Sequence, residues 1–99
     1  MFLTIAAVIA GITALGLAIK IIAYLVIRIV RMYLEQAREK LRNASVRFIA
    51  RYKDGDYERV SAGIWDDNQS KVTDGNTWQA ERLDEELSSI ERNEVLILD

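Results

Sequence analysis

The side chains available for chemistry in this 99-residue chain are carboxylates, lysines and arginines, because the sequence contains neither histidine nor cysteine. Histidine is the commonest general base and metal ligand, and cysteine supplies thiolate nucleophiles. Without them, acid–base chemistry would depend on carboxylates whose pKa is tuned by a dry, shaped pocket. The composition therefore favours a non-catalytic protein that has no catalytic residue and no cofactor.

The acidic residues offer one stretch to test for metal binding, residues 66–76, with the sequence DDNQSKVTDGN. An EF-hand calcium loop needs alternating oxygen ligands, a central glycine and a glutamate at position twelve. Residues 66–76 do not supply that order, and the chain has no glycine-rich phosphate loop and no Ser/His/Asp set. We expect this stretch to be a solvated loop, and we predict no metal site.

The element expected to position the rest of the chain is residues 1–27, which carry no charged side chain before Lys20. About 20 apolar residues at ~1.5 Å each cross the ~30 Å hydrocarbon core of a bilayer, and a single span must be helical. The fold class predicted is a single-pass membrane protein with a long N-terminal transmembrane helix. A signal peptide is a poorer interpretation, because no basic residue precedes Lys20. A buried helix of a soluble domain is also a poorer interpretation, because the rest of the chain has too few apolar residues to surround it.

One side of this expected helix is formed by small residues at helical spacing. In lipid, such a strip lets helix backbones approach closely, so we expect it to pack against other transmembrane helices. The bulkier aliphatic residues of the opposite side are expected to face the lipid bilayer. The helix-packing residues are Ala6, Ala10, Gly11, Ala14 and Ala18.

Charge is segregated along the rest of the chain. Residues 28–53 carry a net charge of +6, and residues 54–99 carry a net charge of −9. The positive-inside rule therefore predicts an integral membrane protein with its N-terminus outside and its C-terminus cytoplasmic. Residues 28–43 are expected to extend the span as a basic juxtamembrane helix. The residues expected at the membrane surface are Lys20, Arg28, Arg31, Arg38, Lys40 and Arg42.

The remaining residues are expected to form a small α+β tail. Residues 44–65 fit either a helix or a β-hairpin, and the Asp54-Gly55 pair favours a hairpin turn that places Lys53 opposite Asp56. The loop over residues 66–76 would follow. Residues 77–99 are expected to form an acidic C-terminal helix, ending near Arg92, and then an apolar terminus.

The narrow apolar stripe of this tail predicts a docking surface for a soluble or capsid-like protein partner. Nucleic acid is not expected as a partner, because the acidic half repels phosphate and no binding motif is present. The partner-docking residues are Leu83, Leu87, Ile90, Leu96 and Leu98.

These features predict a non-catalytic membrane anchor or small structural subunit of a larger membrane-associated complex. One alternative is a minor membrane protein of a membrane-containing phage or virus, which would link an internal lipid vesicle to the capsid and lie in the virion's internal membrane. A second alternative is a holin-like pore-former that oligomerises through the small-residue strip.

Overall fold

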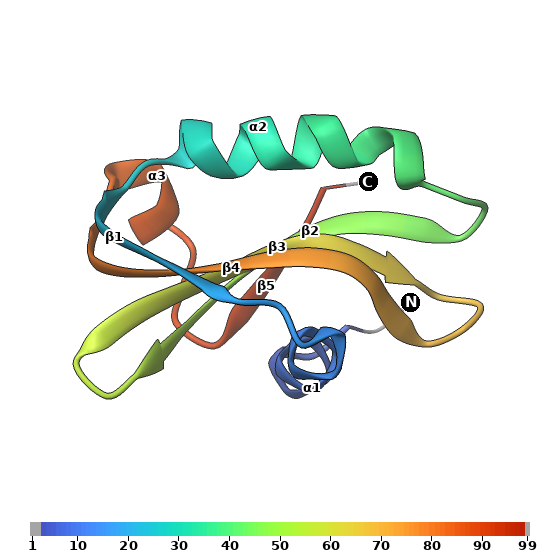
Figure 1. Ribbon diagram of the computed structural model, residues 1–99, viewed down its shortest axis with the longest axis horizontal. Helices are drawn as coiled ribbons and strands as arrows, with labels where there is room; N and C mark the ends of the chain where they lie inside the picture. The colour runs from blue at the N-terminus through green and yellow to red at the C-terminus, as the bar shows by residue number, and fades with distance from the viewer. Residues whose placement is uncertain (1–2, 99) are drawn as a thin grey trace.

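Figure 1 shows the computed structural model, which describes residues 3–98 as one mixed sheet with helices on both faces. The elements are α1 (Ile5–Leu15), β1 (Ile19–Leu25), α2 (Ile27–Ala37), the 3-10 turn η1 (Arg38–Lys40), β2 (Ser45–Asp54), β3 (Tyr57–Asp66), β4 (Lys71–Leu83), α3 (Glu85–Ser88) and β5 (Glu94–Ile97). The strand order is β1-β4-β3-β2-β5. β1 is parallel to β4, and every other pair of neighbours is antiparallel.

The expected transmembrane helix over residues 1–27 is wrong. α1 begins after Thr4, whose hydroxyl accepts a hydrogen bond from the Ala7 amide (3.1 Å), and it ends at Gly16, whose φ of 65° closes the helix. The chain then continues as β1, where β-branched isoleucines favour an extended backbone. No helix within residues 3–98 combines the length and the apolar character needed to cross a membrane.

Two further predictions are therefore wrong. They are the single-pass membrane fold and the integral-membrane location with an outside N-terminus and a cytoplasmic C-terminus. The apolar N-terminal residues contact the sheet instead of lipid: Val8 and Ile12 pack on Phe48 and Trp65. The basic segment does not extend α1 either. It lies largely in α2, a separate helix that buries Val30 on the opposite face of the sheet.

A single carboxylate fixes where α2 and α3 begin. Asp84, at the end of β4, accepts hydrogen bonds from the Ile27 amide (2.8 Å) and from the Leu87 amide (2.9 Å). Helix N-termini carry unpaired amide groups and a partial positive charge, so one anion satisfies and stabilises both. Asp84 thus joins the start of α2 to the C-terminal part of the chain.

Residues 44–65 contain the β2–β3 hairpin, but its register differs from the expected one. Asp54 pairs with Tyr57 and Lys53 pairs with Glu58, so the two loop residues are Gly55 and Asp56. Gly55 has a φ of +62°, which suits the first loop position of a type II′ turn, where glycine is strongly preferred. The turn chemistry therefore shifts each cross-strand partner by two residues.

The expected loop over residues 66–76 and the long helix after it are also corrected. β4 starts at Lys71 and runs to Leu83, and the only helical turn within residues 77–92 is α3. β4 lies between β1 and β3, so both of its edges are hydrogen bonded. These pairings, together with burial of Trp78 and Ala80, override the local helical pattern.

Two glycines allow close approaches at the sheet, Gly75 between α1 and β4 and Gly63 between β3 and β4. Gly63 and Gly75 are opposite each other on β3 and β4. A Cβ on Gly75 would lie 2.5 Å from the Ile12 Cδ1 atom of α1, so the Ile12 side chain would have to move. Gly75 therefore leaves the space that the Ile12 side chain occupies where α1 packs on the sheet.

We expect Gly63→Ala to lower the free energy of unfolding by about 2 kcal/mol, because its new Cβ would overlap the backbone carbonyl oxygen of Asp74. Gly75→Ala is the matched comparison, since its Cβ meets mainly the flexible end of Ile12, and its cost should be about half as large. Urea unfolding measures both variants. Equal stability of Gly63→Ala and the parent protein would contradict the close backbone approach.

Candidate functional site

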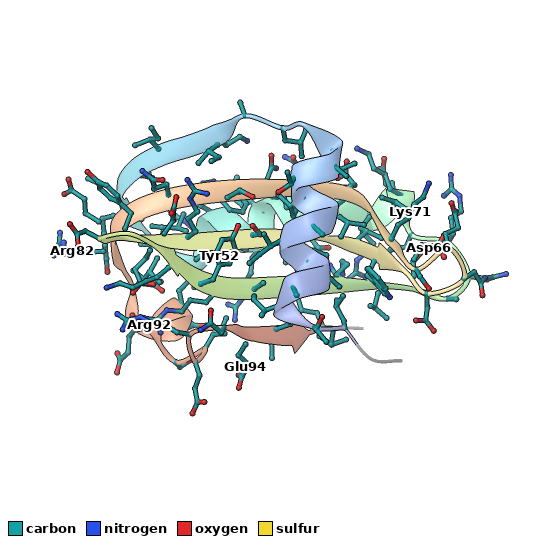
Figure 2. The ribbon with its side chains drawn as sticks, turned by 90° about the horizontal axis from the view of Figure 1, so that it is seen from below. Tyr52, Asp66, Lys71, Arg82, Arg92 and Glu94 are labelled. Atoms are coloured by element: carbon teal, nitrogen blue, oxygen red, sulfur yellow. The ribbon has the colours of Figure 1, made fainter. Side chains whose placement is uncertain are left out.

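α1 crosses the strands of the sheet and covers only part of one face (Figure 2). Tyr52 is visible on the uncovered part, toward the strand ends that carry the β2–β3 turn. We call this region the open half-face. Its floor consists of side chains from β2, β3 and β4, namely Tyr52, Arg59, Ser61, Thr77 and Gln79.

Three hydroxyl groups form a hydrogen-bonded row across this floor. The Tyr52 hydroxyl lies 2.9 Å from Ser61 Oγ, and Ser61 Oγ lies 2.8 Å from Thr77 Oγ1. All three residues are buried. The antiparallel register places Ser61 directly opposite Thr77, which brings their hydroxyls together. Each of the three buried hydroxyls therefore has a hydrogen-bond partner within the row.

Arg59 is the charged member of the floor, and other side chains hold it. Its guanidinium donates to Gln79 Oε1 at 3.1 and 3.2 Å and pairs with Asp54 Oδ2 at 2.7 Å. Asp54 therefore offsets the Arg59 charge at the edge of the floor. The arrangement leaves the centre of the open half-face polar but close to neutral.

A trough runs along the side of the open half-face next to β1. One hollow of about 220 Å³ lies under the C-terminal half of α1, with Leu17, Ile19 and Thr77 among its lining residues. A second hollow, of about 330 Å³, is lined in part by Ile21, Tyr57 and Gln79. The register pairs Ile19 with Thr77 and Ile21 with Gln79, so the two hollows follow the same pair of strands.

The border of this trough is apolar and exposed. The large exposed side chains that line it are Ile9, Leu17, Ile19, Ile21 and Tyr57. Ile21 is 80% exposed, although isoleucine is among the residues most often buried. Within the described residues, β1 has a neighbouring strand on one side only, so its other edge presents unpaired backbone groups.

In the part of the chain that the structure describes, the hydroxyl row of the open half-face has no adjacent general base. Among residues 3–98, no hydrogen bond joins Tyr52, Ser61 or Thr77 to a carboxylate, and the chain has no imidazole to act as a base. A serine without such a partner is a weak nucleophile at neutral pH. The described residues also contain no group of acidic side chains arranged to hold a metal ion.

The groups with shifted pKa values lie outside the open half-face. Burial and the hydrogen bond to Asp74 (2.5 Å) raise the pKa of Tyr33 on α2 well above its usual value. Burial alone would raise the pKa of Glu58, but hydrogen bonds from Arg51 and Arg92 lower it below its usual value. Both side chains are held in structural contacts, which explains the shifts without a catalytic role.

A larger groove, of about 610 Å³, lies between α2 and the C-terminal segment, with Met32, Leu34 and Leu98 among its lining residues. Two of the three arginines that line it are held by other groups of the chain. Arg31 pairs with Glu86 at 2.8 Å, and Arg47 donates to the Leu34 carbonyl at 3.3 Å and lies 3.6 Å from Glu35. These contacts make the groove a weaker candidate than the open half-face, despite its size.

The structure distributes the residues predicted from the sequence over several surfaces. Of the expected helix-packing residues, Ala6, Ala10, Ala14 and Ala18 are exposed, whereas Gly11 faces Val72. Of the expected docking residues, Leu87 and Ile90 are buried in the core, Leu83 is half-buried, and Leu96 and Leu98 are exposed near β5. The expected roles of these residues stay predictions.

The cations expected at a membrane surface are likewise spread out. Lys20 lies over the Trp78 ring, 5.9 Å from its centroid, and Arg28 and Arg31 are on the exposed side of α2. Lys40 pairs with Asp74 at 3.2 Å and Arg38 lies 3.5 Å from Glu35. Arg42 is exposed between η1 and β2. These side chains therefore do not form one continuous patch with a shared partner.

The floor of the open half-face is not among the sites predicted from the sequence. Tyr52, Ser61 and Thr77 come from three strands, and their meeting depends on the register of two hairpins. The only local signal was the alternation of Thr77 and Gln79 with Trp78 and Ala80, which is typical of a strand with one polar side. Comparison of the chain with protein-family models, curated proteins and solved structures found no match.

Proposed function

We propose that this protein is a non-catalytic structural subunit that docks a protein partner through the open half-face and the free edge of β1. The observation that carries this proposal is the gathering of exposed apolar side chains around one trough beside an unpaired strand. Exposed apolar side chains that gather on one surface are typical of protein interaction sites. The proposal keeps the structural-subunit role expected from the sequence and assigns it a different surface.

The shape of the trough favours a protein over a small ligand. Its two separate hollows, of about 220 and 330 Å³, lie below and at the lower end of the ~300–1,000 Å³ range of clefts that enclose small molecules. Its rim is aliphatic, and burying an exposed isoleucine such as Ile21 contributes about 1.5–3 kcal/mol. A partner strand or apolar side chain covers such a surface well, and the backbone of β1 supplies hydrogen bonds to it.

The test is co-purification of the full-length chain from its native cells with one charged substitution at a time. Ile21→Glu should remove the stoichiometric protein partner, because it buries a carboxylate in an apolar contact. Met32→Glu is the matched control, since Met32 is also exposed but lies on α2, over the opposite face. Retention of the same partner by both variants, or equal loss from both, would contradict the proposed surface.

A further inference from the structure

We propose that the partner at β1 is a second copy of this chain, joined by antiparallel pairing of residues 19–25 about a two-fold axis at Ile22. This inference rests on the proposed function, because it names the occupant of the same docking surface. The pairing would join two five-stranded sheets into one continuous sheet. The order and direction of the backbone groups, the charges and the side-chain sizes along β1 each support it.

The backbone groups that point to the free edge can be identified from one hydrogen bond. The Asp84 amide donates to the Leu25 carbonyl at 3.0 Å, so the backbone groups of Leu25 point toward the β4 side. Along a strand, the amide and carbonyl of successive residues point to alternate sides. Lys20, Ile22 and Tyr24 therefore present their amides and carbonyls to the open edge.

This alternation restricts the register of a dimer. In an antiparallel pair, residues that exchange both hydrogen bonds must each point toward the other strand. Centring the pair on Ile22 places Ile22 opposite its own copy and Lys20 opposite Tyr24 of the partner copy, and it overlaps all seven residues of β1. A centre at Ile21 or at Ala23 leaves fewer outward residues with a partner. The Ile22 register thus forms the most interchain hydrogen bonds.

Charge and size are compatible with the same register. Lys20 would lie opposite the uncharged Tyr24 of the other copy, whose ring is contacted by its own Arg82 at 4.9 Å from the ring centroid. Parallel in-register pairing would instead bring Lys20 next to Lys20, which is unfavourable. On the opposite side of the strand, the exposed Ile21 would lie beside the small Ala23 of the other copy. Each bulky or charged side chain therefore meets a group that accommodates it.

The other sheet edge is a poorer candidate for self-pairing. β5 is only four residues long and begins with Glu94, whereas β1 has seven residues and a single charge. Short, charged edge strands are a common way for proteins to avoid pairing. β1 has neither protection, and it is continuous with the apolar trough of the open half-face.

The absence of cysteine from the native sequence makes a single-cysteine experiment unambiguous. In the proposed register, Ile22→Cys faces its own copy with about 5.5 Å between Cα atoms, which suits a disulfide. Ile21→Cys and Ala23→Cys are matched controls, because each would lie roughly 8 Å from its own copy, beyond disulfide reach. Leu96→Cys on β5 reports contacts of the other edge.

We expect sedimentation of the unmodified chain to give twice its 11.3 kDa mass, and mild oxidation to link Ile22→Cys at least tenfold faster than the other three variants. A monomeric unmodified chain, equal linking of all four variants, or fastest linking at Ile21, Ala23 or Leu96 would overturn the inference. If the chain is monomeric while Ile21→Glu still loses a different protein in cells, the proposed function stands and only the second copy is excluded.

Discussion

Val8→Asp is expected to lower the free energy of unfolding by about 4 kcal/mol, the largest effect predicted for a single substitution in this chain. Val8 is completely buried in the cluster between α1 and the sheet, next to Phe48 and Ala50. The substitution removes apolar contacts and places a carboxylate where no hydrogen-bond partner is available. Small domains have a total stability of only about 5–15 kcal/mol, so a large part of it would be lost.

Ala10→Asp is the matched control, because Ala10 is on the same helix but on its exposed side. It should change the stability by less than about 1 kcal/mol, mainly through the lower helix propensity of aspartate. Urea unfolding followed by circular dichroism and tryptophan fluorescence measures both variants, and Trp65 reports directly on the cluster. Equal losses would show that Val8 does not face the sheet.

The same helix shows why hydropathy alone misled the fold prediction. The stretch before Lys20 is apolar enough for a membrane, and the remaining chain looked too polar to enclose a helix. In the structure α1 is not enclosed. It buries chiefly Val8 and Ile12 and leaves Ala6 and Ala10 exposed, so much less apolar surface was needed. Two local signals indicated a short helix followed by a strand. Gly16 can end a helix, and the β-branched residues after it favour an extended backbone.

The C-terminal half shows the complementary error. An apolar stripe at helical spacing, from Ala80 to Ile90, predicted one helix, yet β4 occupies the first part of it. The stripe fits either period over such a short distance. Whether these residues form a helix or a strand depends on β1 and β3, which lie on either side of β4. β1 is distant from β4 in the sequence, and β3 is joined to β4 by a turn. Pairing of that kind is not encoded in a local window.

For the candidate site, composition could predict what chemistry the chain lacks, but not where its polar residues meet. The absence of histidine and cysteine follows directly from the sequence. The row formed by Tyr52, Ser61 and Thr77 needs the correct register of both hairpins, and the expected β2–β3 register was shifted by two residues. Changing a register changes which side chains are opposite each other, so no motif could reveal the row.

Glu58→Ala is expected to lower the free energy of unfolding by about 3 kcal/mol, because it leaves a nearly buried guanidinium without its anion. The Glu58 and Arg51 side chains are only 10% and 12% exposed, and their closest charged atoms lie 3.1 Å apart. Arg51 also donates to the carbonyls of Ser88 and Ile90, at 2.9 and 2.7 Å. The pair therefore links the β2–β3 hairpin to the segment around α3, and urea unfolding at pH 7 measures its loss.

Two comparisons separate the charge of Glu58 from its packing. Arg92→Gln removes the other partner, whose side chain is 53% exposed, and should cost less than about 1 kcal/mol.

Glu58→Gln keeps the shape of the side chain but cannot ionise. Because the pKa of Glu58 is lowered in the fold, its contribution is complete above the unfolded value of about 4.3 and is lost as the pH falls through the lower, folded value. The stability difference between the parent protein and Glu58→Gln should therefore be constant above about pH 5 and shrink toward pH 2. A difference that stays constant down to pH 2 would show that the Glu58 carboxylate is not stabilised in its ionised form.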